Sequence, residues 1–240
     1  MTRLTSCPDA ASVAERAAAH VRLAIEHART ERGVAHVALS GGGTPEDTYR
    51  LLGEDPRALA ATEWWFADER CVPPEDAESN FRMAAETLLE PAGIAPELIH
   101  RMRGELGPAA GAQQYEGELR EHLRPGPGGL VTIDLAVLGI GPDGHVASLF
   151  PGAATLQEDH ALCLGVEDSP KPPPERITLS MPVLRAARSC LLVATGASKA
   201  DALAAMLGDP TASVPASLLR RERLTVITDD AAAPPPPNRG

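Results

Sequence analysis

Aromatic and sulfur-containing side chains are scarce in this 240-residue chain. Phe, Trp and Tyr together make up 3% of it, so the core must be built mostly from Ala, Leu and Val. The few cysteines are widely scattered and show no CxxC or other metal-ligand spacing; they are Cys7, Cys71, Cys163 and Cys190. This pattern predicts reduced thiols of a cytosolic protein rather than a disulfide framework, and we see no cluster of metal ligands in the sequence.

Long apolar runs and excess positive charge are also missing. No run of 18 apolar residues occurs, and the first ten residues contain no apolar signal-peptide core, so we expect neither a membrane span nor a secretory signal. The formal net charge of −11 argues against general binding to nucleic acid or to an anionic membrane. A small anionic ligand in a locally positive pocket remains possible.

Apolar periodicity predicts an alternation of strands and helices. Apolar residues at steps of three and four over 12–30 indicate an amphipathic helix. Further helices are expected from Thr44 onward and over 79–90, 108–124 and 198–207. Short apolar runs predict strands over 34–40, 62–68, 131–140, 161–166, 176–180, 189–196 and 224–228. This order predicts an α/β sandwich around a mainly parallel sheet, formed by one domain over 1–230 and followed by a disordered Pro-rich tail, 231–240.

Four unusual loops each follow a predicted strand. They are Ser40–Pro45, Asp68–Arg70, Gly139–His145 and Thr195–Lys199. Because the carboxyl ends of parallel strands lie at one edge of a sheet, where ligands bind, we expect these distant segments to meet in space.

The first and last of these loops favour an anion. Gly41, Gly42 and Gly43 precede a helix for which Thr44 is the expected cap, so backbone N–H groups and the helix dipole can attract a phosphate. A tight turn that merely needs glycine is the alternative. Lys199 in the first turn of a helix opposes the dipole unless an anion is bound there, although it could equally be a solvated surface lysine.

The middle loops carry acid–base groups. Arg70 stands beside Asp68 and Glu69, either as a surface ion pair or as an arginine directed into the cleft. His145 follows Asp143 by two positions in a glycine-flanked loop. An imidazole with a pKa near about 6.5 can accept a proton from water at neutral pH.

Gly139, Gly141 and Gly144 also fit the GxGxxG pattern of dinucleotide sites. The match is weak because the next residues, HVASLF, run quickly into Pro151-Gly152 instead of forming a long helix. A nucleotide-dependent oxidoreductase therefore stands as a minor alternative.

Taken together, the ordered segments LSGGGTP, WWFADERCVP, SNFRMA, DLAVLGIGPDGHVASLFPG, RITLSMPVL and ATGASK resemble the 6-phosphogluconolactonase family. The resemblance implies a Rossmann-like αβα fold shared with glucosamine-6-phosphate deaminases and ribose-5-phosphate isomerases. It also implies a cytoplasmic enzyme of the pentose phosphate pathway that hydrolyses 6-phospho-D-glucono-1,5-lactone to 6-phosphogluconate. No metal or cofactor is implied, and the expected partner is the sugar phosphate lactone alone, bound by a monomer.

The resemblance also implies roles for the candidate residues. His145 would be the base, Asp143 would orient it or a substrate hydroxyl, and Arg70 would stabilise the oxyanion. The backbone of Gly41–Thr44 would hold the phosphate together with two cations, Arg176 and Lys199. Asp68 would either position Arg70 or bind sugar hydroxyls. Asn80 would contact the substrate or simply begin a helix, and Arg176 could instead be a surface residue at a strand end.

Two further alternatives remain open. The deaminases share a similar DGH loop but continue with a glutamate where this chain has Phe150, and a phenyl ring cannot supply their extra acid–base chemistry. Val146 stands where lactonases often have threonine. A non-catalytic sugar-phosphate-binding protein on the same fold is the other alternative, and the intact Asp143–His145 pair argues against it.

Overall fold

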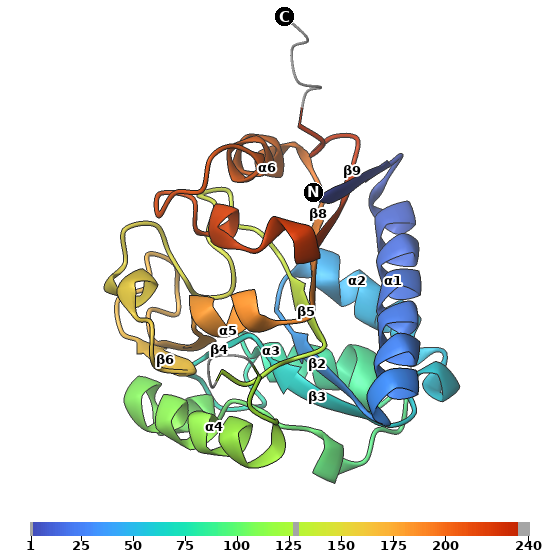
Figure 1. Ribbon diagram of the computed structural model, residues 1–240, viewed down its shortest axis with the longest axis vertical. Coiled ribbons are helices and arrows are strands. Elements are labelled where there is room, and N and C mark those ends of the chain that lie inside the picture. Colours follow the sequence, from blue (N-terminus) through green and yellow to red (C-terminus); the bar gives the residue numbers. More distant parts are fainter. Residues whose placement is uncertain (1, 127–129, 235–240) are drawn as a thin grey trace, which may run out of the picture.

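The computed structural model describes residues 2–126 and 130–234, and its centre is a parallel sheet (Figure 1). The six strands are β1 (Arg3–Cys7), β2 (Ala35–Leu39), β3 (Thr62–Phe66), β5 (Leu135–Leu138), β8 (Ser189–Ala194) and β9 (Leu224–Asp229). Their order is β1-β9-β8-β5-β2-β3, and every neighbouring pair is parallel. All residues of β5 are buried, as a sheet covered on both faces requires. The predicted α/β sandwich is confirmed.

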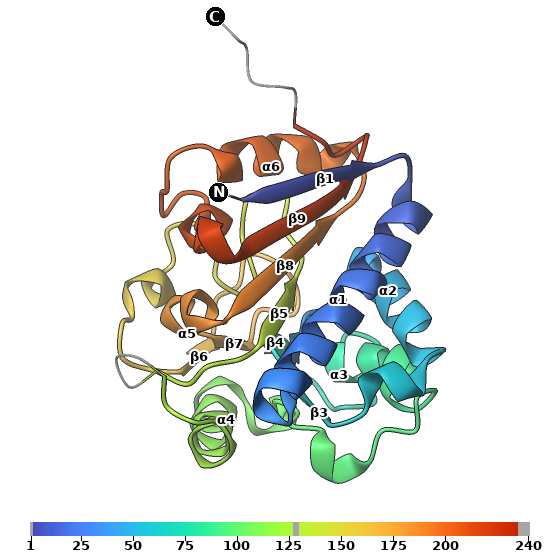
Figure 2. The same cartoon turned by 45° about the vertical axis from the view of Figure 1, so that its right-hand side comes forward.

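Helices cover both faces of this sheet (Figure 2). On one side lie α1 (Ala10–Arg32) and α2 (Gly43–Gly53), which pack against each other. On the other side lie α4 (Pro108–His122), α5 (Met181–Ala186) and a smaller sheet, while α6 (Ala200–Leu207) lies near β1 and β9. The ends of α1 follow helix-capping rules: the Asp9 side chain accepts from the Ser12 N–H, and Gly33 ends the helix at φ 83°.

The smaller sheet is antiparallel and was not expected from the sequence. It consists of β4 (Asp68–Arg70), β7 (Arg176–Leu179) and β6 (Cys163–Val166), in the order β4-β7-β6. The prediction of one strand over 62–68 followed by a loop is therefore wrong for Asp68–Arg70. The chain changes sheets at Ala67, whose N–H donates to Leu39 of the large sheet and whose carbonyl accepts from Leu179 of the small one.

Three local predictions also need correction. Thr44 does not cap α2, because the helix begins at Gly43 with Gly42 as its cap. The helix expected over 79–90 is α3 (Asn80–Ala84) followed by a π-helical turn, Ala85–Leu89. Strand β1 was missed because most of its five residues are polar or charged and partly exposed at the sheet edge.

No helix in the described ranges is both long and apolar enough to cross a lipid bilayer. Of the tail predicted to be disordered, 231–234 is described, and Ala232 is buried there. Residues 235–240 lie outside the described part of the chain.

Candidate active site

A polar cavity of about 210 Å³ lies at the carboxyl ends of β2, β5 and β8. Each of the four predicted loops contributes residues to its wall, as parallel strands require. The wall includes ten of the predicted site residues: Gly41, Gly42, Gly43, Thr44, Asp68, Arg70, Asn80, His145, Arg176 and Lys199. Asp143 does not line the cavity, but its carboxylate contacts the ring of His145, which does. Segments far apart in the sequence thus meet at one pocket.

The glycine loop lies close to the side chain of Asn80 at Gly41. A Cβ on Gly41 would lie 1.9 Å from Oδ1 of Asn80, so only glycine leaves room for that amide. Gly42 adopts φ 113°, a conformation that side chains disfavour. The Thr44 hydroxyl lies 2.7 Å from that of Thr195 and joins the first loop to the fourth. The N-terminus of α2 therefore lines the cavity, and no neighbouring atom lies within 4 Å of where a Cβ on Gly43 would be.

His145 is oriented by Asp143 and by a neighbouring glycine. Nδ1 of His145 lies 2.6 Å from Oδ1 of Asp143. A Cβ on Gly141 would lie 2.0 Å from the same Nδ1, so the ring occupies the space that glycine leaves. With a proton on Nδ1 donated to Asp143, the lone pair of the imidazole is on Nε2. This is the tautomer that a general base needs.

Burial is the main reason that His145 stays neutral near pH 7. Burial lowers the pKa of His145, and the charge of Lys171 lowers it further against the opposing effect of Asp143. Partial burial raises the pKa of Asp143, but the His145 hydrogen bond and the charges of His145 and Lys171 outweigh this and bring the pKa below its usual value. Nζ of Lys171 lies 3.3 Å from Nδ1 of His145 and 3.4 Å from Oδ1 of Asp143.

Four cationic side chains line the same cavity: Arg70, Lys171, Arg176 and Lys199. The whole sequence contains two lysines, and both line this cavity. Burial and the charge of Arg70 lower the pKa of Arg176, and burial and the charge of Lys171 lower that of Lys199. The cations therefore repel one another across the cavity, and a bound anion would relieve that repulsion.

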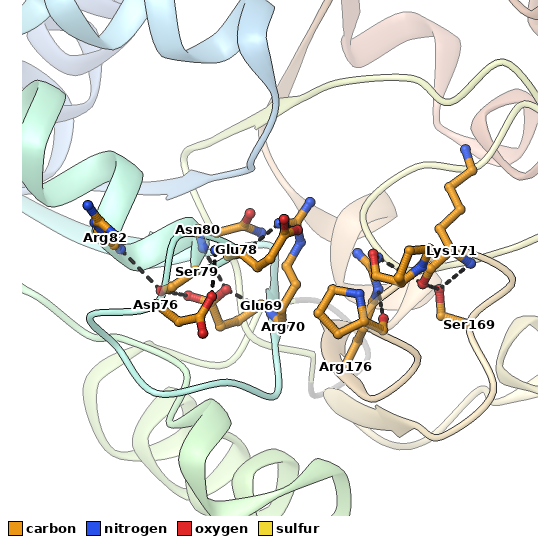
Figure 3. Close-up of polar contacts among 12 residues, drawn as sticks. Glu69, Arg70, Asp76, Glu78, Ser79, Asn80, Arg82, Ser169, Lys171 and Arg176 are labelled. Carbon is orange, nitrogen blue, oxygen red and sulfur yellow. Dashed lines mark hydrogen bonds and ion pairs between the residues drawn. The ribbon is translucent and has the colours of Figure 1, made fainter.

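Arg176 and Arg70 are held by different partners (Figure 3). Arg176 donates from Nε and Nη2 to the carbonyls of Lys171, Pro172 and Pro173, and its guanidinium lies over the Phe150 ring. Arg70 donates to the Glu78 carbonyl, whereas its buried Nε has no hydrogen-bond partner within the described residues. The Arg70 side chain itself lines the cavity, so its guanidinium group lies beside a ligand bound there.

Asp68 is held by residues other than Arg70. Its Oδ2 accepts from the Ser148 hydroxyl at 2.7 Å, and the Asn80 amide donates to its carbonyl at 2.9 Å. The carboxylate that pairs with Arg70 is that of Glu78, at 3.7 Å. Asn80 is both the first residue of α3 and part of the cavity wall, so the two interpretations of this residue are compatible.

Glu69, which the sequence analysis named beside Arg70 but not among the candidate site residues, is a buried carboxylate (Figure 3). It accepts from the backbone N–H groups of Arg70, Asn80 and Phe81, each at 2.7 Å, and from the Ser79 hydroxyl at 3.1 Å. Burial raises its pKa to about 7, although these hydrogen bonds act in the opposite direction. Glu69 joins β4 to the start of α3 and so fixes the positions of Arg70 and Asn80.

The sequence signals for the missed residues were weak. Lys171 lies in a proline-rich loop, and only the pairing of β6 with β7 brings that loop to the cavity. Glu69 alternates with Asp68 and Arg70 along β4, which places it on the opposite face, but that signal exists only once the segment is known to be a strand.

The glycine-rich segment after β5 does not continue as a helix. Residues 142–149 form turns, with an isolated bridge between Val146 and Leu149. A dinucleotide site of the predicted GxGxxG type needs a helix N-terminus at this point. The oxidoreductase interpretation therefore loses its structural basis.

Comparisons with known proteins agree with this geometry. A family model described as glucosamine-6-phosphate isomerases/6-phosphogluconolactonase matches residues 8–228. A probable 6-phosphogluconolactonase of Schizosaccharomyces pombe is 37% identical over 230 residues, covering 92% of this chain and 89% of that protein. A 6-phosphogluconolactonase of Streptomyces coelicolor is 38% identical over 226 residues, covering 89% of this chain and 86% of that protein.

Solved structures show the same fold. That of 6-phosphogluconolactonase from Trypanosoma cruzi has a TM-score of 0.86 at 28% identity and covers 97% of this chain and 96% of its own. A monomeric glucosamine-6-phosphate deaminase has a TM-score of 0.79 at 22% identity, covering 96% of this chain and 98% of its own, and shares the fold. On the evidence of the family model and of these relatives, the chain belongs to the glucosamine-6-phosphate isomerase/6-phosphogluconolactonase family.

Proposed function

We propose that this protein hydrolyses 6-phospho-D-glucono-1,5-lactone to 6-phospho-D-gluconate in the oxidative pentose phosphate pathway. The observation that carries the proposal is the Asp143–His145 pair at a cavity lined by four cations. A neutral imidazole supplies the base for water, and the cations suit a substrate that bears a phosphate and develops an oxyanion. The names of the relatives support the same substrate.

In the proposed first step, Nε2 of His145 takes a proton from a water molecule while the water oxygen attacks the lactone carbonyl. The carbonyl π electrons move to oxygen, and the guanidinium group of Arg70 donates to this oxyanion. One donor of this kind contributes about 2.7–4 kcal/mol. In the second step the carbonyl re-forms, the bond to the ring oxygen breaks, and the imidazolium returns its proton to that oxygen. Asp143 orients the ring and stabilises its charged form.

The phosphate is proposed to lie against the N-terminus of α2, held by the backbone of Gly41–Thr44 and by Lys199 and Arg176. The position of the glycine loop in the cavity wall and the mutual repulsion of the cations support this placement. Asp68 is proposed to bind sugar hydroxyls, because its own partners are Ser148 and Asn80 and not Arg70. Asn80 presents the rest of its amide to the same cavity.

Deamination of glucosamine 6-phosphate is the less favoured candidate. Phe150 occupies the position of the glutamate that the deaminases carry. The centroid of its ring lies 4.7 Å from that of the His145 ring. An apolar ring beside the base supplies no second acid–base group. Lactone opening needs only one base, one water and a donor for the oxyanion, which fits this site.

We further propose that residues 1–230 act as one domain and that the protein works as a cytoplasmic monomer without nucleic-acid or membrane partners. The free cysteines, three of which are buried, support a reducing compartment. The acidic net charge supports the absence of polyanionic partners. Size-exclusion chromatography with light scattering tests the oligomeric state.

The decisive experiment is a lactone-hydrolysis assay coupled to detection of 6-phosphogluconate and corrected for spontaneous opening. The wild type should accelerate hydrolysis, and His145→Ala should lower kcat by about 10²–10⁴-fold with little change in KM. Absence of any acceleration by the wild type would overturn the proposal. Ammonia release from glucosamine 6-phosphate would favour the deaminase, and binding of the lactone without turnover would favour a binding protein.

A further inference from the structure

A second group of histidines and carboxylates lies at the opposite end of the parallel sheet from the cavity. Glu63 is near the start of β3, His122 is the last residue of α4, and His100 lies between them in the chain. The backbone N–H of His100 donates to the Trp64 carbonyl at 2.8 Å, which fixes this loop to β3. Three segments far apart in the sequence thus meet here, which is why no ligand spacing was visible.

The ring of His100 is buried and tightly oriented. The residue is 3% exposed, and the ring stacks on Trp65 with centroids 3.9 Å apart and planes 8° from parallel. Its Nδ1 lies 3.3 Å from Oε1 of Glu118, and the Gln114 amide donates to the other oxygen of that carboxylate at 3.0 Å. A carboxylate that holds one histidine nitrogen in this way is the usual outer partner of a metal-bound histidine.

The other nitrogen of His100 faces a second carboxylate. Nε2 lies 3.2 Å from Oε2 of Glu63, and neither buried atom has a hydrogen-bond partner among the described residues. If Nδ1 carries the proton given to Glu118, Nε2 presents a lone pair to a carboxylate oxygen. Two acceptors at this distance repel unless a positive charge lies between them, which leaves a second proton on the ring or a metal ion.

His122 supplies a third donor beside this pair. Its ring centroid lies 4.5 Å from that of His100, and ligand atoms of Glu63, His100 and His122 all lie within 4.8 Å of one another. His122 is exposed, so an ion and its water can reach the group from solvent. The separation of 3.2 Å between Glu63 and His100 is close to the about 3.3–3.5 Å expected between two ligands of a tetrahedral zinc ion.

We propose that Glu63, His100 and His122 bind a divalent transition-metal ion, with Zn²⁺ the best match to two imidazoles and one carboxylate. The two negative charges of Glu63 and Glu118 balance the charge of such an ion. His36, whose Nδ1 lies 3.4 Å from Oε2 of Glu63, is the nearest further imidazole. The ion would join the end of α4 to β3 and stabilise the fold, away from the proposed hydrolysis.

Metal binding can be measured on chelator-treated protein by titration with Zn²⁺ in a calorimeter. Because the His145 region offers its own ligands, the comparison is between His122→Ala and the matched variant His160→Ala, which removes another exposed histidine. We expect His122→Ala to lose one bound Zn²⁺ or to bind it at least about tenfold more weakly, as expected for the loss of one of three ligands. His160→Ala should bind like the wild type.

Two further readouts separate this site from others. Co²⁺ should quench the fluorescence of Trp65 at a lower concentration in the wild type and in His160→Ala than in His122→Ala, because Trp65 stacks on His100. At the same concentration, Zn²⁺ should raise the unfolding temperature of these two proteins by more than that of His122→Ala. Equal Zn²⁺ binding and equal quenching in His122→Ala would overturn the proposal, as would absence of a bound ion in the wild type.

Discussion

Arg70 and Arg176 lie directly opposite each other on the antiparallel strands β4 and β7. Residues in such a pair point to the same face, and like charges in this position destabilise a sheet. The two arginines are tolerated because backbone carbonyls hold Arg176 and Glu78 pairs with Arg70. A bound anion would relieve the repulsion that remains between the two arginines. Through this register the small sheet places both arginines for the proposed function.

The two arginines should differ in their kinetic effects although they are neighbours. Arg70→Ala should lower kcat by about 10²–10³-fold, because the proposed oxyanion loses its donor. Arg176→Ala should mainly raise KM, because the phosphate is bound in both the ground state and the transition state. Steady-state kinetics of both variants check this, with Arg120→Ala on the exposed face of α4 as the control. Identical effects on kcat would contradict the division of roles.

The presence of both lysines in one cavity allows a chemical test. Lys199→Ala should raise KM by about tenfold or more with a small change in kcat, because it removes a phosphate contact. An amine-specific reagent should modify Lys171 and Lys199 in the free protein, and 6-phosphogluconate should protect Lys199. Peptide mass spectrometry locates the labelled sites. Labelling of Lys199 at an unchanged rate in the presence of the product would remove this residue from the phosphate site.

The pH dependence of the reaction should report His145. Burial and the charge of Lys171 lower its pKa, so the neutral base persists below about pH 6.5. We expect kcat/KM to rise with pH along a limb centred below that value and to be level at pH 7. Replacing Lys171 with Met removes a positive charge and should move the limb to higher pH. A wild-type limb at or above pH 6.5, after correction for spontaneous opening, would contradict the lowered pKa of His145.

Glu69 should affect both stability and the site. In the folded state its pKa is about 7, against 4.5 for an exposed carboxyl group, so its contribution to stability is full below pH 4.5 and is lost as pH rises through 7. Glu69→Gln lacks this titration and places an amide N–H₂ group among donors, at a cost of about 1–3 kcal/mol. Denaturant unfolding at several pH values should show the largest deficit of the variant near pH 5. A deficit that grows with pH would contradict the raised pKa.

We expect Gly141 to be required for the position of the base, His145, and not for folding of the chain. A Cβ on Gly141 would lie 2.0 Å from Nδ1 of His145 and 2.4 Å from Oδ1 of Asp143, so Gly141→Ala should displace the pair and lower kcat nearly as far as His145→Ala. The matched variant is Gly139→Ala on the same loop, where an added Cβ meets only the Gly41 carbonyl at 3.9 Å and should cost far less. Equal losses in the two variants would show that the loop, rather than the pair, is sensitive.

The sequence predicted the meeting of the four loops because continuous apolar strands alternating with helices leave few sheet arrangements. It could not predict the second sheet. The turn of the chain at Ala67 depends on carbonyl and amide partners in two sheets at once, and no local pattern encodes them. Lys171 was missed for the same reason, since β6–β7 pairing carries its loop to the cavity. The expected cap at Thr44 was wrong because the helix begins one residue earlier, at Gly43, after Gly42 with φ 113°.

The pairing of β4 with β7 also determines whether the two arginines of the cavity are aligned. Trp64 and Trp65 are buried in the large sheet, whereas Arg70 and Arg176 are aligned only by the small one. A molecule in which β4 and β7 are out of register can therefore bury both tryptophans without an aligned pair of guanidinium groups. A slip of one residue between β4 and β7 would also turn one of the two arginines away from the cavity without exposing the main core. Return of enzymatic turnover is thus the stricter measure of correct assembly.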